Sequence, residues 1–292
     1  MKGHEAICLL FVAVAALVAS PGEVLPAHAS PAPRAAAAPV AQSVGSPNEG
    51  HLVGGVKLEP KPYLRVLPGH EERWGLPELV GMLDRSAKRV ERRFPGSALG
   101  VGDLSRRGGG DVMGHHSHES GRDADVAFYL RDARGRQVLA PHLAAIDEKG
   151  RATSLPGATF DDARNWALVE AWLTDPQTRI NRVFVAEHLR DRLLAHARRA
   201  GASAATRARA AEVLFQPKTS SHDDHFHVRI GCPRNQEGCL EFVTKEEPKR
   251  ATAHKGRAAK PRRRAGSAHV ERPVAVVASA PDDFAPEPST AP

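Results

Sequence analysis

Cysteine is scarce in this sequence, and no apolar run is long enough to cross a membrane. Three of the 292 residues are Cys. No small-residue lipobox precedes Cys8, which argues against a lipid anchor at that residue. The most apolar stretch, Ile7–Ala19, is shorter than the ~20 residues of a membrane-spanning helix. We therefore expect no transmembrane span in the mature protein.

The short apolar stretch instead has the features of a secretory signal peptide. Lys2 supplies a basic start, and Ala-x-Ala-type cleavage sites follow, near Ser20 or at Ala27-His-Ala29. We predict a signal peptide over residues 1–29 and export to the periplasm; an uncleaved membrane anchor is the alternative. Export makes nucleic acid an unexpected partner despite the net charge of +7.

Removal of the signal peptide would leave two cysteines, Cys232 and Cys239. In an exported protein, two cysteines seven positions apart are expected to form one local disulfide. A zinc site that uses this pair is the weaker interpretation, because the spacing does not suit it and an oxidising compartment favours the disulfide.

Both ends of the chain have the composition of unfolded segments. Residues 30–47 are rich in Ala and Pro, which predicts a linker. Residues 244–292 form a Pro/Ala-rich tail, in which Lys249–Arg264 carries eight Lys or Arg and no acid. The tail is predicted to be disordered, as a solvated linker or as a contact to anionic envelope polymers. The folded domain is then expected over residues 48–243.

Within this domain, helical and strand-like segments alternate without a regular repeat. Thr159 is a candidate cap for the second helix, and the two tryptophans in that helix are expected to pack in the core. The order predicts an α+β fold with a small, mainly antiparallel sheet flanked by helices. The expected helices are Leu76–Arg93, Thr159–Leu173, Glu187–Ala200 and Ala205–Leu214, and the expected strands are Ser97–Leu104, Ala124–Leu130 and Ile180–Ala186.

Two segments dense in His and Asp each precede a strand-like run. His115–Asp125 contains three histidines and two aspartates, and His222–His227 follows about a hundred residues later. In the second segment, strand alternation would send His225 and His227 to one face and Phe226 to the other. In the first, a turn at Gly121 would bring His118 and Asp125 together.

A hydrolytic zinc site needs three protein ligands and an open position for water, whose pKa then falls to about 7. Imidazole and carboxylate ligands without thiolates suit Zn²⁺. The two segments therefore predict one divided zinc site. The plainer interpretations are an incidental His-x-His pair, adventitious metal binding by a His-rich loop, or a structural metal.

The motifs Ser117-His-Glu-Ser-Gly-Arg-Asp-Ala-Asp125 and His225-Phe-His-Val-Arg-Ile230 resemble those of the penicillin-insensitive murein endopeptidases. This family is related to lysostaphin-type enzymes and D-Ala-D-Ala carboxypeptidases, which share a His-x6-Asp and a His-x-His motif on a small antiparallel sheet. The resemblance covers roughly Gly45 to Val243. It differs in Arg122 and in Asp223-Asp224, which place extra charges beside the motif histidines, and in keeping one of the several disulfides of relatives.

The resemblance also implies roles for individual residues. It makes His118, Asp125 and His227 the zinc ligands and His225 the base that takes a proton from water. His115 and His222 would polarise the scissile carbonyl or donate a proton to the leaving amine, and Asp123 would fix the orientation of a histidine. His116 receives no role.

Together these features predict a periplasmic zinc metallopeptidase with peptidoglycan as its substrate. The expected reaction is hydrolysis of D-alanyl–meso-diaminopimelyl cross-links by metal-activated water, without a serine nucleophile. Two alternatives stay open: a D,D-carboxypeptidase or dipeptidase with the same zinc centre, and a non-catalytic cell-wall-binding protein whose metal is structural.

Overall fold

A computed structural model describes residues 40–218 and 220–241 of this protein. The predicted signal peptide 1–29 and the basic tail 244–292 lie outside the described residues. Among the described residues, no helix has the length and apolar character needed to cross a membrane.

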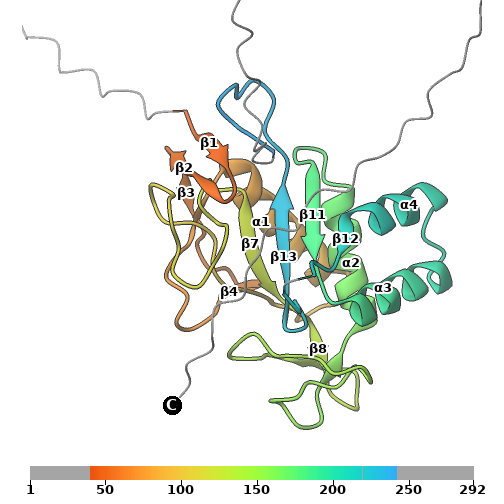
Figure 1. The fold of residues 1–292 in the computed structure, drawn as a ribbon. Coiled ribbons are helices and arrows are strands. Elements are labelled where there is room, and N and C mark those ends of the chain that lie inside the picture. Colours follow the sequence, from red (N-terminus) through yellow and green to blue (C-terminus); the bar gives the residue numbers. More distant parts are fainter. Residues whose placement is uncertain (1–39, 219, 242–292) are drawn as a thin grey trace, which may run out of the picture. The chain divides into compact units, whose positions relative to one another are not determined.

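The central element is a six-stranded sheet in the order β12-β11-β13-β7-β6-β4 (Figure 1). Its three inner pairings, β11–β13, β13–β7 and β7–β6, are antiparallel. The two outer pairings, β11–β12 and β4–β6, are parallel. The α+β class with a mainly antiparallel sheet is therefore confirmed. The strands are β4 Leu64–Val66, β6 Leu99–Val101, β7 Asp123–Ala127, β11 Ile180–Phe184, β12 Leu214–Phe215 and β13 His225–Ile230.

Three small sheets complete the strand content of the described residues. They pair β1 Gln42–Ser46 with β2 Glu49–Val53, β3 Val56–Lys57 with β5 Trp74–Gly75, and β8 Leu130–Arg131 with both β9 Gln137–Val138 and β10 Thr159–Phe160. β1 falls inside the predicted linker, so ordered structure begins before the expected boundary. Its composition is weakly strand-forming, but Gly45 exchanges backbone hydrogen bonds with the segment at Gly238 and Leu240.

The predicted helices are present, with one changed start. They are α1 Pro77–Arg93, α2 Asp162–Leu173, α3 Glu187–Arg199 and α4 Ala204–Val213. The prediction that α2 begins at Thr159 was wrong, because Thr159 pairs with Arg131 in the β8–β10 sheet. Asp161 caps the helix instead, and its side chain accepts hydrogen bonds from the backbone N–H groups of residues 163 and 164.

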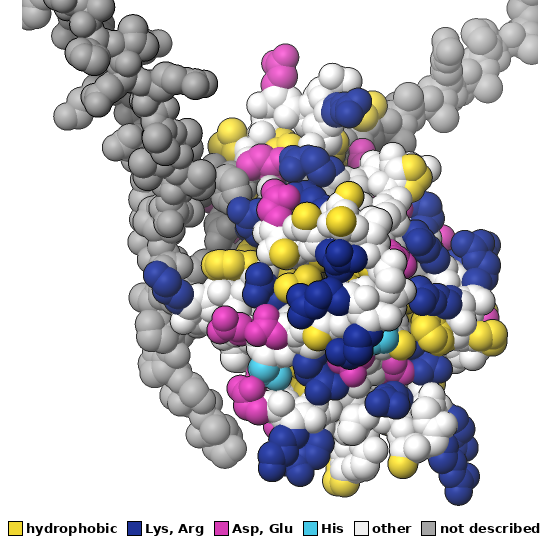
Figure 2. Space-filling model, turned by 90° about the vertical axis from the view of Figure 1, so that its right-hand side faces the viewer, with side chains coloured by type: hydrophobic (Ala, Val, Ile, Leu, Met, Phe, Trp, Pro, Cys, Tyr) yellow, Lys and Arg dark blue, Asp and Glu magenta, His cyan; other side chains and the backbone are white. Residues whose placement is uncertain are grey.

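The core lies between the central sheet and the helices, with α1 and α2 packed against each other. Phe226 points to this side and makes edge-on contacts with Phe128 and Trp172, at ring-centroid distances of 4.7 and 5.5 Å. Trp166 and Trp172 are buried, as expected, and Trp172 donates a hydrogen bond to Ser86. α3 and α4 lie next to α2 on the right-hand side of Figure 1, and Figure 2 views the protein from that side, where Lys and Arg side chains are spread over the surface. The opposite face of the sheet carries polar side chains, among them those of His225, His227 and Arg229.

Candidate metal centre

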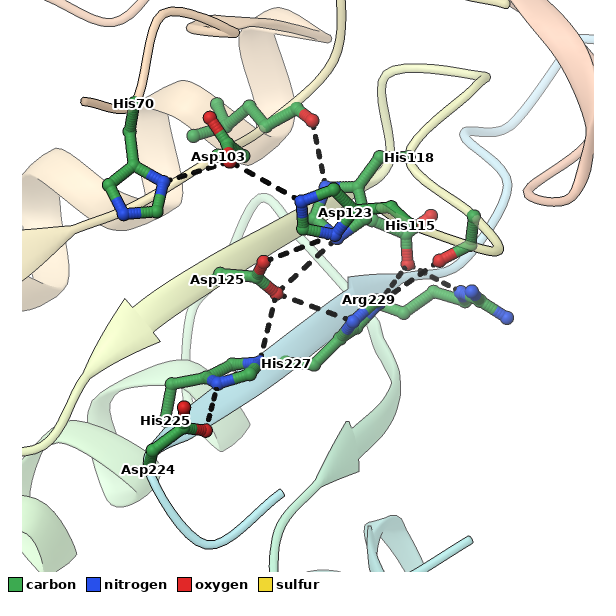
Figure 3. Close-up of polar contacts among 12 residues, drawn as sticks. His70, Asp103, His115, His118, Asp123, Asp125, Asp224, His225, His227 and Arg229 are labelled. Carbon is green, nitrogen blue, oxygen red and sulfur yellow. Dashed lines mark hydrogen bonds and ion pairs between the residues drawn. The ribbon is translucent and has the colours of Figure 1, made fainter. Parts of the chain in front are cut away.

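The polar face of the sheet is assembled by the pairing of β7 with β13. In this antiparallel register His227 lies opposite Asp125, and Arg229 lies opposite Asp123. Because side chains alternate along each strand, these four groups and His225 all lie on the face opposite the core. Residues about a hundred positions apart thus converge on one point (Figure 3).

The loop before β7 adds His118 to this face. Its ring Nδ1 donates a hydrogen bond to the carbonyl of Leu104 at 2.7 Å, and its backbone has a φ of +75°. That left-handed conformation is uncommon for a residue with a side chain, so the fold holds His118 in a strained position. The predicted turn at Gly121 is present with a φ of +75°, where an added Cβ would lie 2.6 Å from Leu52.

The Asp125 carboxylate lies at the centre of a ring of imidazoles. Its Oδ1 is 3.3 Å from His118 Nε2, 3.3 Å from His225 Nε2 and 3.4 Å from His227 Nδ1. Its Oδ2 is 3.5 Å from His115 Nδ1. Asp125 Oδ1 and His118 Nε2 are buried and have no hydrogen-bond partner, although buried polar atoms are nearly always satisfied.

These separations fit a shared zinc ion. Two ligand atoms bound tetrahedrally at 2.0–2.2 Å from zinc lie about 3.3–3.5 Å apart, and the inward nitrogens of His118, His225 and His227 each have that spacing from Asp125. Ligand-type clusters also appear as His115, His118 and Asp125, and as His222, His225 and His227. A cation would satisfy the two buried atoms that otherwise lack partners. The donor set present therefore fits Zn²⁺.

Hydrogen bonds outside the cluster fix which ring nitrogen faces inward. His227 Nε2 donates to Asp123 Oδ1 at 2.8 Å, so His227 turns Nδ1 toward Asp125. His118 uses Nδ1 for Leu104 and turns Nε2 inward. Each inward nitrogen is then free to bind a metal, and a carboxylate or carbonyl behind the ring is the usual support for a ligating histidine.

Asp123 is completely buried and serves two donors, because Arg229 Nε also reaches its Oδ1, at 2.6 Å. Burial favours the neutral acid, but the charge of Arg229 and the hydrogen bond from His227 outweigh it and lower the pKa of Asp123. Asp123 is thus a permanent negative charge behind His227.

Charge is also concentrated at Asp125. Burial raises its pKa, yet His118 and His225 hold the pKa of this carboxyl well below its ordinary value. In return, Asp125 overcomes the burial of His225 and, with Asp224, raises the pKa of His225 to about 10. A buried carboxylate needs a nearby positive charge, which protons on these histidines can supply and a divalent cation can replace.

His222 and His227, in contrast to His225, have pKa values below the ordinary value of histidine. Burial, together with the electrostatic effects of His227 and His225, lowers the pKa of His222 to about 3. Burial also lowers the pKa of His227 to about 4, although Asp123 opposes the shift. Both rings are therefore neutral near pH 7. The ring centroid of His222 lies 5.4 Å from that of His225 and 5.8 Å from that of His227.

Two further residues belong to this cluster and carried no role in the sequence interpretation. Asp103 Oδ2 accepts hydrogen bonds from His70 Nδ1 at 2.8 Å and from His115 Nε2 at 3.3 Å. Asp103 ends the segment Val101-Gly-Asp, which also resembles the corresponding segment of the family and was a usable signal. His70 stands in the loop before β5, next to Glu71 and Glu72 but outside both segments dense in His and Asp, so the sequence did not connect it with the site.

The disulfide between Cys232 and Cys239 is confirmed, with Cα atoms 5.8 Å apart. Arg122 does not face the histidines. Its side chain is buried under the disulfide loop, where it donates to the carbonyl of Leu240 at 2.5 Å and pairs with Glu241 at 3.4 Å. Arg122 therefore anchors the segment that leaves β13.

Comparison of the sequence with known proteins places this chain in a family. The sequence profile described as penicillin-insensitive murein endopeptidase matches residues 43–267, well over half of the chain. A penicillin-insensitive murein endopeptidase of Haemophilus influenzae is 26% identical over 210 residues, which span 68% of this chain and 66% of that relative. Enzymes of the same name from Salmonella typhi and Klebsiella pneumoniae are 27% identical over 241 residues and 29% over 207 residues. These matches span 80% of both chains for Salmonella typhi, and 68% of this chain and 69% of the relative for Klebsiella pneumoniae. The chain belongs to the penicillin-insensitive murein endopeptidase family of peptidases.

Proposed function

We propose that this protein is a zinc-dependent murein endopeptidase that hydrolyses the D-alanyl–meso-diaminopimelyl cross-links of peptidoglycan in the periplasm. The observation that carries the proposal is the buried trio of His118, Asp125 and His227, in which each inward ring nitrogen lies at zinc-ligand spacing from Asp125, in a chain of this peptidase family. Periplasmic location and signal cleavage are part of the proposal, since its substrate lies outside the cytoplasm.

His118 Nε2, a carboxylate oxygen of Asp125 and His227 Nδ1 would hold the zinc ion. Three protein ligands leave a position open, as in catalytic rather than structural zinc sites. When bound, the metal supplies Lewis acidity toward a carbonyl and lowers the pKa of water. This open position argues against the alternative of a purely structural metal.

His225 is the proposed general base. Its Nδ1 is held by Asp224 at 2.6 Å, and its Nε2 faces Asp125 at 3.3 Å. Burial favours the neutral acid of Asp224, but the hydrogen bond and charge of His225 lower the pKa of Asp224, so its carboxylate stays charged behind the ring. A cation held by Asp125 would offset the carboxylate charge that raises the pKa of His225, so that Nε2 could take a proton from water; the Asp224 carboxylate would fix the ring and stabilise the imidazolium that forms.

His115 and His222 are the proposed partners of the scissile peptide. Hydrolysis adds a hydroxyl group to the D-alanyl carbonyl carbon and a proton to the diaminopimelyl amine. His222 is neutral and can donate one N–H to a developing oxyanion. His115, whose Nδ1 faces Asp125, is placed to hand a proton to the leaving amine.

Digestion of purified, cross-linked sacculi tests the function. The zinc-loaded protein should convert dimeric muropeptides to monomers; a chelator should stop the reaction, and penicillin should not. His118→Ala serves as the inactive reference, and Arg136→Ala, which alters only an exposed ion pair, as the matched active control. Loss of a terminal D-Ala without resolution of dimers would show the D,D-carboxypeptidase alternative instead. Binding to sacculi without any cleavage would show the wall-binding alternative.

A further inference from the structure

We infer that Asp103 is a positioning residue that holds the imidazole of His115 in its working orientation, with His70 as the second support of the same carboxylate. The inference rests on the function proposed above and adds two residues to its machinery. Neither residue is among the ligand-type clusters of the site.

The hydrogen bonds define the arrangement (Figure 3). Asp103 Oδ2 receives His70 Nδ1 at 2.8 Å and His115 Nε2 at 3.3 Å. The other ring nitrogen of His115, Nδ1, lies 3.5 Å from Asp125 Oδ2. The His115 ring is therefore suspended between two carboxylates, and Asp103 determines which nitrogen points toward the metal centre.

The backbone of Asp103 is itself fixed to the centre. The Asp125 N–H donates to the Asp103 carbonyl at 2.8 Å, and the Gly102 N–H donates to the Asp125 carbonyl at 2.8 Å. The next residue, Leu104, accepts the hydrogen bond of His118. One short segment after β6 thus sets the positions of Asp125, His118 and, through Asp103, His115.

His115 needs such support because its own loop offers little. The preceding residue, Gly114, has a φ of +83°, and the neighbouring Met113 is 93% exposed. These two neighbours supply no packing to hold the His115 ring, which otherwise contacts the His118 ring at a centroid distance of 4.5 Å. A displacement of about 1 Å in a catalytic group can cost about a hundredfold in rate.

His70 completes the support from the opposite side. Its ring lies over Gly102, where an added Cβ would come within 3.3 Å of Cε1. The glycine therefore leaves room for the imidazole to reach Asp103. The plainer explanation of these contacts is an ion pair that only stabilises the loop, and the experiment has to separate the two.

The first variant is Asp103→Asn, which keeps the shape of the side chain and removes its charge. We expect kcat on cross-linked dimeric muropeptide to fall about 10- to 100-fold, with KM and zinc content unchanged. Asp84→Asn is the matched control, because Asp84 also serves two donors, Lys61 Nζ at 2.6 Å and Tyr63 Oη at 2.9 Å, but lies on α1 away from the site. A rise in KM or a loss of zinc with unchanged kcat would overturn the inference.

The decisive step is a double-mutant cycle with His115→Ala. If Asp103 acts through His115, Asp103→Asn should lower kcat in the native background and cause no further loss in the His115→Ala background. An equal loss in both backgrounds would overturn the positioning role. If His115→Ala is too slow to measure, the kcat and KM values of Asp103→Asn alone test the positioning role: a lower kcat at unchanged KM supports it, and an unchanged kcat overturns it. Failure of the unmodified protein to cleave the dimer would refute the proposed function itself, before any variant is compared.

Discussion

Asp123→Asn is the substitution with the largest combined effect expected outside the ligands. The Asp123 carboxylate accepts hydrogen bonds from His227 at 2.8 Å and from Arg229 at 2.6 Å. Asn preserves the shape and removes the charge. The substitution should therefore weaken both the buried ion pair and the support of the proposed ligand His227.

The expected magnitude of the stability loss follows from burial. Asp123 is fully buried, and Arg229 is 7% exposed. Removing one partner of a buried pair costs about 3–5 kcal/mol, because the other charge is left without compensation. Since a domain is typically stable by about 5–15 kcal/mol, the variant should still fold. The lost support behind His227 should weaken zinc binding by about 10- to 100-fold.

Urea unfolding of the zinc-free proteins measures the first effect, and competition with a chromophoric chelator measures the second. Arg136→Ala is the control, because Arg136 is 71% exposed in its pair with Asp132 and such surface pairs contribute about 0–1 kcal/mol. An Asp123→Asn protein within 1 kcal/mol of the native one, with unchanged zinc affinity, would refute this reasoning.

Three further predictions follow from other parts of the protein. Zinc at 100 times its dissociation constant should stabilise the fold by about 2.7 kcal/mol, so a chelator should lower the Tm in calorimetry; an unchanged Tm would contradict zinc binding. Replacing Cys232 and Cys239 by Ser should lower the free energy of unfolding in urea by about 2–3 kcal/mol, and equal stability would count against the disulfide's role. Burial raises the pKa of Asp175, but Arg85 outweighs it and lowers the pKa below its ordinary value. The destabilisation by Asp175→Asn should therefore be full near pH 7 and shrink as the pH falls below about 4; a penalty that grows in acid would contradict this.

Local patterns in the sequence were sufficient for much of the fold. The helix expected over Leu76–Arg93 is present as α1, which begins at Pro77 and buries Leu79, Leu83 and Val90 at helical spacing. Alternation along β13 correctly placed Phe226 in the core and His225 and His227 on the opposite face. These features depend on the geometry of one element, which is why the sequence could indicate them.

Features that depend on distant partners were not predictable in the same way. Thr159 has the chemistry of a helix cap, but pairing with β8 draws it into a strand and leaves the cap to Asp161. β1 looked like a linker by composition, yet partners near Gly238 order it.

The candidate site shows the same division. The ligand chemistry was visible in two segments. The strand register that places His227 opposite Asp125, however, depends on pairing between segments far apart in the sequence. His70 was missed because it meets Asp103 only through the folding of the chain, 33 residues apart. The assignment of individual ligands and bases stays a prediction, supported by spacing and burial.

The most direct measurement of the central claim is hydrolysis of a purified cross-linked dimeric muropeptide in ¹⁸O-labelled water, followed by mass spectrometry. The zinc-loaded protein is expected to yield monomers with one ¹⁸O atom on the newly formed D-alanyl carboxylate, and a chelator should abolish the reaction until zinc is restored. Full cleavage after complete zinc removal, or release of terminal D-Ala from an intact dimer, would contradict the account.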